Sequence, residues 1–303
     1  MLFRSRALVA VADTQSYSGA ARSIGVAQPT IYRAARELEA RLGIPLFQTS
    51  ANRVALTRAG ERLSGGVRLT FAEIETALLE VFEAHSAAAG RIRIGALPLA
   101  RATFLSKAVD LATSRRPAFK AHVSDGPYSD LLLALRFGAL DVLLGALRDP
   151  LPARDVEQHV LFMDRLGVFC GPGHPLLSQD TVCREDLQRF CWVVPPIGTP
   201  TRSYFDDALS DVGTQTTNAL VETSSMILVR ELLQSNERLT LISSAQVAAE
   251  VRKGVLFEIP FRLNDKPRPI GLTIRKDWNP TDAQRDFVEA LYDNNWTRPD
   301  TRY

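Results

Sequence analysis

Apolar residues recur at helical spacing through the first 45 residues, in three blocks separated by glycine or polar residues. The pattern predicts three short helices, over residues 2–13, 18–24 and 28–42. Ser16 or Ser18 is a suitable N-cap for the second helix, and Gly25 ends it. Pro29 suits the first turn of the third helix, and Gly43 suits its C-cap. Two helices joined by a short glycine-containing turn have the proportions of a helix-turn-helix.

A small hairpin and a long helix are predicted next. Strand-like residues at 46–47 and 54–56, with a turn at 50–52, predict a β-hairpin wing. Thr57 can cap a helix that runs to a linker at 87–90. Its apolar positions follow spacings of four and three residues, at Val67, Phe71, Ile74, Leu78 and Val81. This seam of two heptads favours dimerisation of two chains, and the alternative is an amphipathic helix packed on its own chain.

From residue 91 onward, strand-like runs alternate with helix-like runs. Strands are predicted at 92–96, 119–123, 142–145, 166–170, 192–194, 239–242, 255–259 and 270–274. Helices are predicted at 105–114, 130–137, 204–209, 226–234, 245–253 and 283–294. The alternation predicts α/β units with mostly parallel sheets. About 200 residues exceed one typical domain, so two α/β lobes with a cleft between them are expected.

Charge is distributed unevenly along the chain. The 303 residues carry a net charge of +2, but residues 1–60 alone carry +5 and the remainder −3. A basic first fifth on an otherwise acidic chain favours a polyanion-binding module, and the alternative is a solvated helical face. No apolar run is long enough for a membrane helix, and the apolar stretch 7–12 is too short for a signal peptide, so a cytoplasmic protein is expected.

Cysteine and histidine usage argues against disulfides and metal. The three cysteines give an odd number without CxxC spacing, and no two of the four histidines stand at metal-ligand spacing. We therefore expect a reducing compartment, no metal site and no cofactor.

Several segments match the LysR family of transcriptional regulators in register. The DNA-binding signature is carried by 16–21 (SYSGAA), 26–31 (VAQPTI), 38–43 (LEARLG), 46–47 (LF) and 54–60 (VALTRAG). The later segments 91–96 (RIRIGA), 138–142 (GALDV) and 173–176 (GHPL) resemble the family's effector domain. The resemblance covers essentially the whole chain.

The resemblance implies a multidomain α+β fold. Residues 1–57 would form a winged helix-turn-helix and residues 58–90 a linker and dimerisation helix. Residues 91–303 would form a two-lobed α/β effector-binding domain of the periplasmic-binding-protein type. Lobe I would comprise about 91–163 and 270–297, and lobe II about 164–269. The expected partners are double-stranded DNA, a small-molecule effector, RNA polymerase and further copies of the chain, as a dimer or as a tetramer made of two dimers.

Three positions depart from the family's usual residues. Ala27 stands where serine is usual, Tyr32 where serine or threonine is usual, and Gln48-Thr49 where a basic pair is often found. Ala27 removes an expected N-cap, which costs about 1 kcal/mol of helix stability in typical cases. The other two changes remove potential phosphate contacts.

The third helix would enter the major groove with its N-terminal residues. Gln28 can pair bidentately with adenine and Arg33 with guanine, while the methyl group of Thr30 suits thymine. Pro29 would fix geometry rather than read sequence. Phosphate contacts are expected from Arg22, Arg36 and Arg53, and Ser18 completes the predicted DNA-binding set. For each arginine the alternative is a solvated surface charge.

The ligand would lie between the lobes, at strand ends and helix N-termini. Three arginines are expected to hold an organic anion of the carboxylate class, of which an aromatic acid is one candidate, namely Arg101, Arg148 and Arg202. The remaining predicted effector residues are Leu97, Pro98, Thr103, Tyr128, Ser129, Thr199, Thr201, Ser224 and Ser225. The alternative for Thr199, Thr201 and Ser224 is that they serve as helix caps.

A solute-binding protein and an enzyme are the two alternative classes. A solute-binding protein shares the two-lobed architecture, but it predicts a signal peptide and no basic N-terminal domain. An enzyme would need acid–base groups, for which Asp141, His174 and Glu222 are candidates. No nucleophile elbow, P-loop, GxGxxG or metal motif accompanies them, so a regulator is favoured and catalysis is not expected.

Overall fold

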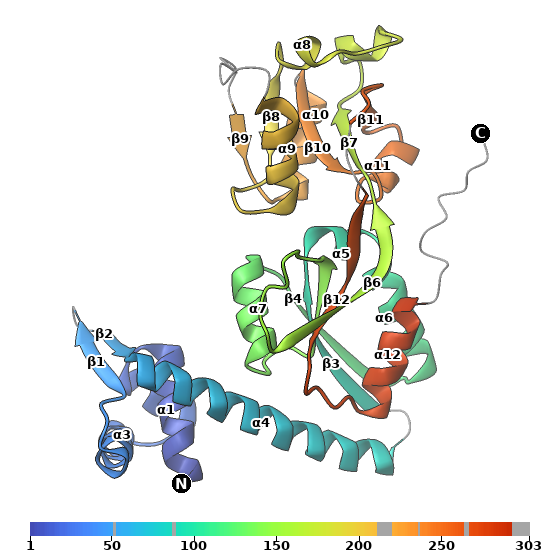
Figure 1. Ribbon diagram of the computed structural model, residues 1–303. Coiled ribbons are helices and arrows are strands. Elements are labelled where there is room, and N and C mark those ends of the chain that lie inside the picture. The colour runs from blue at the N-terminus through green and yellow to red at the C-terminus, as the bar shows by residue number, and fades with distance from the viewer. Residues whose placement is uncertain (51–52, 87–88, 211–219, 236, 264–266, 293–303) are drawn as a thin grey trace. The chain divides into compact units, whose positions relative to one another are not determined.

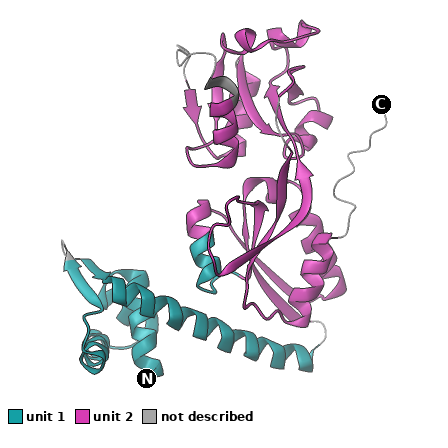
Figure 2. Cartoon of the chain, in the orientation of Figure 1, with its two compact units in different colours: residues 1–86, 132–140 teal, residues 87–131, 141–303 magenta. Residues whose placement is uncertain are grey.

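A computed structural model describes residues 1–50, 53–86, 89–210, 220–235, 237–263 and 267–292 (Figure 1). The chain divides into two compact units (Figure 2). Unit 1 comprises Met1–Ser86 with Leu132–Leu140, and unit 2 comprises Ala87–Leu131 with Asp141–Tyr303. None of the helices in the described ranges is long and apolar enough to cross a membrane.

Unit 1 begins with the predicted three helices and wing. Its elements are α1 (Leu2–Thr14), α2 (Tyr17–Ile24), α3 (Gln28–Leu42), β1 (Phe47–Ser50), β2 (Arg53–Leu56) and α4 (Arg58–His85). β1 and β2 pair antiparallel, with Phe47 opposite Leu56. Leu8, Val11, Ile31, Leu38 and Leu46 form the centre of one apolar core. The three helices share this core because each presents its apolar stripe to the other two.

Helix α4 is capped as predicted, since the N–H of Gly60 donates to Thr57 Oγ1 at 3.1 Å. Gly65 has a packing reason that the sequence did not reveal. A Cβ there would lie 2.6 Å from the ring of Phe137, in the segment 132–140 of the same unit. Glycine has a lower helix propensity than other residues, but at this position it allows the close contact with Phe137.

Unit 2 contains two five-stranded sheets. The first has the order β4-β3-β5-β12-β6 and comprises β3 (Ala89–Ala96), β4 (Ala118–Ser124), β5 (Val142–Ala146), β6 (Val156–Asp164) and β12 (Arg268–Arg275). The second has the order β11-β7-β10-β8-β9 and comprises β7 (Leu166–Cys170), β8 (Cys191–Val194), β9 (Leu220–Glu222), β10 (Arg238–Ser243) and β11 (Phe257–Glu258). Below, the parts built on the first and second sheets are called lobe I and lobe II.

The helices of unit 2 pack on these sheets. Those of lobe I are α5 (Pro98–Ala102), α6 (Phe104–Arg115), α7 (Tyr128–Arg136), whose C-terminal half belongs to unit 1, and α12 (Asp282–Tyr292). Those of lobe II are η1 (Pro175–Ser178), α8 (Arg184–Leu187), α9 (Pro200–Ser210), α10 (Met226–Ser235) and α11 (Ala248–Arg252). One apolar core fills lobe I and two fill lobe II.

The expectation of mostly parallel sheets is wrong. β3 pairs parallel with β4 and β5, but β12 pairs antiparallel with both β5 and β6. In lobe II, β8 pairs parallel with β9 and β10, whereas β7 pairs antiparallel with β10 and β11. β6 leads directly into β7, and β12 returns from lobe II, so these connecting strands run against their neighbours.

Strands β6 and β9 were missed from the sequence. β6 is the edge strand of its sheet and most of its residues are only partly buried, so its sequence VEQHVLFMD lacks a clear apolar alternation. β9 has three residues, and the predicted strand 255–259 shortens to Phe257–Glu258.

Candidate DNA-binding and effector-binding sites

Local sequence places α3 at the surface of unit 1. Ser16 caps α2, because its Oγ accepts the N–H of Gly19 at 3.3 Å. Gly25 ends α2 with a φ of 79°, a left-handed conformation that favours glycine. Helix α3 then begins at Gln28 with Pro29 in its first turn. Ala27 supplies no side-chain cap, because its methyl group cannot accept a hydrogen bond.

All eight predicted DNA-binding residues are exposed. They are Ser18, Arg22, Gln28, Pro29, Thr30, Arg33, Arg36 and Arg53. Ile31, Ala34, Ala35 and Leu38 of α3 face the core instead. The helix thus presents a polar face that begins at its N-terminus, which is the end that reads bases in helix-turn-helix proteins.

Arg36 is held against its own helix. It donates from Nε to the hydroxyl of Tyr32 at 3.2 Å and from Nη1 to Glu39 at 2.8 Å, and its guanidinium lies 5.2 Å from the centre of the Tyr32 ring. The hydrogen bonds to Tyr32 and Glu39 raise the pKa of Arg36. A phosphate contact by Arg36, predicted from sequence, would have to compete with these partners.

Tyr32 itself stands on the outward face of α3. It is 46% exposed, and its ring meets that of Tyr17 edge-on with 5.3 Å between centroids. From the sequence, this tyrosine predicts the loss of a phosphate contact. In the structure it is a fixed aromatic side chain beside Gln28 and Arg33, and a residue atypical for its family at an exposed helix position was the signal that could have drawn attention to it.

Glu39 connects α3 to the wing. Its Oε1 accepts the backbone N–H groups of Leu46 at 2.8 Å and Phe47 at 3.1 Å. Burial would raise the pKa of Glu39, but these two bonds and Arg36 outweigh it, and the pKa is lowered. The carboxylate therefore fixes the start of β1, and with it the hairpin that carries Arg53.

The predicted seam of α4 is exposed along its second half. Ile74, Leu78 and Val81 are 45%, 55% and 57% exposed, while Val67 and Phe71 are half-buried. Phe82, which is not part of the predicted seam, is 66% exposed one helical turn after Leu78. Four large apolar side chains in solvent on one stripe of a helix favour an intermolecular contact over packing within the chain.

Arg148 is the predicted effector residue with the most unusual surroundings. It follows β5, is half-buried, and its guanidinium lies 4.2 Å from the centre of the Tyr128 ring. Burial lowers the pKa of Arg148, Tyr128 partly opposes this shift, and the positive charge of Arg268 adds to it. Among the described residues no carboxylate pairs with Arg148, and its side-chain neighbour is Tyr128.

Arg268 was not predicted, yet it organises the junction of the lobes. It donates to Asp164 at 2.9 Å and to Thr201 Oγ1 at 2.7 Å, and Ser243 donates to the same carboxylate at 2.6 Å. Asp164 ends β6 and Arg268 opens β12, so the pair joins the two connecting strands. Nothing in the local sequence of Arg268 signals this role, because its partners lie 67 and 104 residues away.

The other two predicted arginines already have carboxylate partners. Arg101 pairs with Asp125 at 2.7 Å on the surface. Arg202 is only 13% exposed and pairs with Asp206 at 2.8 Å and Glu222 at 2.9 Å. The three arginines therefore do not share one environment, and Arg148 alone retains a charge that no described carboxylate offsets.

Most of the predicted hydroxyl groups bond locally. Thr199 caps α9 by accepting the N–H of Arg202 at 3.3 Å, and Ser225 accepts that of Leu228 at 3.4 Å. Thr103 donates to Leu99 O and Ser129 to Asp130. Thr201 differs, because its oxygen accepts from Arg268 instead of capping a helix.

The remaining predicted effector residues are Leu97, Pro98 and Ser224. Leu97 donates its N–H to Leu144 O at 2.9 Å and precedes α5, which Pro98 opens. Ser224 is exposed before α10. Within the described ranges, no group of three histidine, cysteine or acidic residues could hold a metal ion.

Family models match both parts of the chain. Residues 3–61 match the model of the bacterial regulatory helix-turn-helix protein, lysR family, and residues 85–296 match the LysR substrate binding domain. The transcriptional regulator GalR of Pseudomonas putida is 29% identical over 90% of this chain and 70% of its own length. PcaQ of Agrobacterium fabrum is 27% identical over 93% of this chain and 91% of its own length.

Solved structures agree in fold. A full-length OxyR variant from Pseudomonas aeruginosa superposes with a TM-score of 0.71 at 21% identity, covering 100% of this chain and 98% of that one. CbnR, a LysR family regulator, superposes with a TM-score of 0.66 at 18% identity, covering 96% and 98%. These relatives are regulators and not enzymes, and with the two family models they show that the chain belongs to the LysR family of DNA-binding transcriptional regulators.

Proposed function

We propose that this regulator binds promoter DNA as a dimer or tetramer through α3 and the wing, and that a small organic anion bound at Arg148 controls it. The proposal of an anionic effector rests on the half-buried guanidinium of Arg148, which lacks a carboxylate partner among the described residues. We further propose that the protein acts in the cytoplasm, where a bacterial chromosome lies, and that it contacts RNA polymerase.

For DNA, we assign base reading to Gln28, Thr30 and Arg33, whose side chains are exposed at the start of α3. Arg22 and Arg53 are assigned to phosphates, because their exposed charges flank this face. CbnR has been solved with its target DNA, which supports the same use of the homologous domain. A dimer formed through α4 would present two copies of α3 to a pseudo-palindromic site.

The DNA assignment is tested with Gln28→Ala and Arg53→Ala on specific and scrambled duplexes at several salt concentrations. Gln28→Ala is expected to lose about 1–3 kcal/mol of discrimination, and Arg53→Ala to weaken both duplexes alike and reduce the salt slope by about one. Equal losses on both duplexes for Gln28→Ala would overturn its assignment.

For the effector, we assign the primary contact to Arg148. Its partial burial strengthens a charge-assisted bond to a carboxylate. The hydroxyl of Tyr128, which lies next to Arg148, is assigned as a second donor. The ring of Tyr128 gives the carbon skeleton, aromatic or aliphatic, an apolar surface.

The effector assignment is tested by thermal shift with a panel of aliphatic and aromatic carboxylates. At least one acid is expected to raise the Tm of the wild type but not the Tm of Arg148→Ala. Arg101→Ala is the control, because it removes only a surface ion pair, and the same acid is expected to raise its Tm. Tyr128→Phe is expected to weaken the same acid by about 1 kcal/mol. An acid that stabilises Arg148→Ala as much as the wild type, or a panel without any hit, would overturn the assignment.

A further inference from the structure

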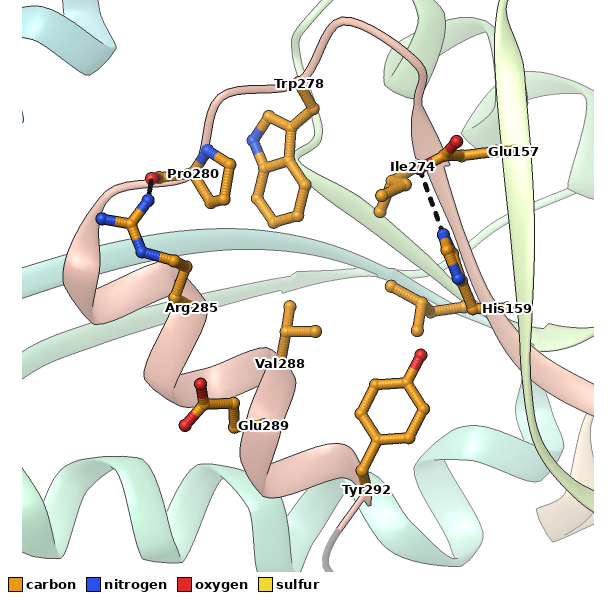
Figure 3. Close-up of a pocket in the computed structure, with 10 residues that line it drawn as sticks. Glu157, His159, Ile274, Trp278, Pro280, Arg285, Val288, Glu289 and Tyr292 are labelled. Atoms are coloured by element: carbon orange, nitrogen blue, oxygen red, sulfur yellow. Dashed lines mark hydrogen bonds and ion pairs between the residues drawn. The ribbon is translucent and has the colours of Figure 1, made fainter.

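A cavity of about 320 Å³ lies on lobe I, between α12 and strands β6 and β12 (Figure 3). Leu272, Ile274 and Val288 supply apolar surface, and Trp278 and Tyr292 supply aromatic rings. Such a volume lies at the lower end of the range found for small-molecule sites. Because Arg268 stands four to six residues before Leu272 and Ile274 on β12, the cavity is separated from the junction of the lobes by roughly 13–20 Å.

The charges that border this cavity are mainly negative. Glu157 lies on the strand side and Glu289 on the helix side (Figure 3). His159 contacts Glu157 Oε1 at 3.1 Å. Within the described ranges, no ion pair is found for Glu289.

Arg285, the arginine of the lining, does not offset Glu289. Its guanidinium turns to the carbonyl oxygen of Pro280 at 2.5 Å and pairs with Asp282 (Figure 3). Asp282 therefore balances the charge of Arg285. The charged groups that remain in the lining are the carboxylate of Glu289 on the helix side and the Glu157–His159 pair on the strand side.

Aromatic rings beside carboxylates recognise a particular chemistry. A cation is attracted to the face of tryptophan and tyrosine rings, and it forms charge-assisted hydrogen bonds with carboxylates. An organic anion would meet repulsion from Glu157 and Glu289, so the ligand class differs from that proposed at Arg148.

We propose that this cavity is a second small-molecule site, which takes a compound with an apolar, preferably aromatic, body and a positively charged amine. The body lies on Leu272, Ile274 and Val288, and the ammonium group is held by Glu289 near the ring of Tyr292. The site is independent of the effector assignment, since it shares no residue with the surroundings of Arg148.

The probe is 2-phenylethylamine, titrated into the full chain by isothermal calorimetry. Its matched controls are 2-phenylethanol, which lacks the charge, and 3-phenylpropionate, which reverses it. The amine is expected to bind with saturation, the alcohol roughly tenfold more weakly, and the acid not at this site.

Variants then locate the binding. Glu289→Gln is expected to weaken binding of the amine roughly tenfold without changing binding of the alcohol. Val288→Trp is expected to fill the cavity and to weaken binding of both compounds. Glu73→Gln, an exposed glutamate of α4, and Arg148→Ala are expected to bind the amine as the wild type does. Because Glu289 is exposed, Glu289→Gln keeps the test valid if Val288→Trp fails to fold.

Three results would overturn the proposal. The first is an absence of saturable amine binding, and the second is amine affinity unchanged in Glu289→Gln. The third is a fall in molecular mass by light scattering for a folded Val288→Trp, which would make the cavity a contact between copies of the chain. Loss of acid binding in Arg148→Ala with amine binding retained would support both sites separately.

Discussion

The reading face of α3 and the surroundings of Arg148 are built in opposite ways. The reading face comes from the outward-facing positions of one short stretch of one helix, 28–36, and its polar side chains are exposed. The surroundings of Arg148 combine Tyr128 and Arg268 from two distant segments, and the charged groups are wholly or partly buried.

This difference has an energetic consequence. An exposed arginine keeps its hydration, so each one on α3 can be changed with little effect on the fold. A buried arginine needs a partner, and Arg268 and Arg202 have carboxylates while Arg148 has a tyrosine ring. A buried charge without a carboxylate partner is therefore a more specific sign of ligand binding than an exposed one.

The largest expected effect concerns assembly, because the reading face works in pairs. Ile74→Asp with Leu78→Asp places two charges in the exposed seam of α4 and is expected to convert dimers or tetramers to monomers. Specific DNA affinity should then fall more than a hundredfold, since one α3 contacts only half of a two-fold site. Light scattering and DNA titration measure the two effects.

The control for this pair is Glu73→Ala with Glu80→Ala, two exposed positions on another side of the same helix. It is expected to keep the oligomer. An unchanged mass for the seam variant would show that the apolar stripe serves another purpose.

The second prediction contrasts buried and exposed ion pairs directly. Arg268→Met leaves Asp164 buried without its cation, and is expected to lower the free energy of unfolding by about 3–5 kcal/mol. Arg230→Met breaks the exposed pair with Glu231 and is expected to cost at most about 1 kcal/mol. Urea denaturation measures both, and similar losses would remove the distinction drawn between the two kinds of arginine.

The third prediction tests whether Tyr32 belongs to the reading face. Tyr32→Ala removes the ring and releases Arg36, and is expected to weaken the specific duplex about tenfold with a much smaller effect on a scrambled one. Tyr32→Phe keeps the ring and removes only the hydroxyl, so most of the preference should remain. If Tyr32→Ala binds both duplexes as the wild type does, the tyrosine only packs against Tyr17.

The smallest expected effect is a pH dependence located in lobe II. Burial lowers the pKa of His174 below its ordinary value of 6.5, while Glu237 opposes the shift. A lowered folded pKa means that the stability from neutral His174 is present above pH 6.5 and is lost as the pH falls below it.

His174→Asn keeps an acceptor for the N–H of Leu176, which His174 Nδ1 accepts at 3.2 Å, and it cannot titrate. Between pH 7.5 and 5 it is expected to lose less stability than the wild type in urea denaturation. DNA affinity should not follow the same dependence. An identical acid dependence in both proteins would assign the loss to other groups.

Features that depend on neighbouring residues were predicted correctly from the sequence, and features that depend on distant segments were missed. Helix α3 was predicted to the residue, and Ser16, Gly25, Gly43 and Thr57 act as the caps or helix ends that their chemistry suggests. Each of these features depends on neighbours within a few residues. The strand β6 was missed because an edge strand needs a paired neighbour, and its partner β12 lies about a hundred residues later.

The sequence by itself determined the helical blocks, the wing, the basic first segment, the spacing of the apolar seam and the family. These depend on local spacing and on residue type, which a linear reading contains. Only the tertiary structure decided which arginine keeps its charge available. Arg101 and Arg202 look like Arg148 in the sequence, but folding brings Asp125 to the first, Asp206 and Glu222 to the second, and the ring of Tyr128 to the third. The electrostatic state of a side chain depends on the groups that surround it in space, and most of those groups are distant along the chain.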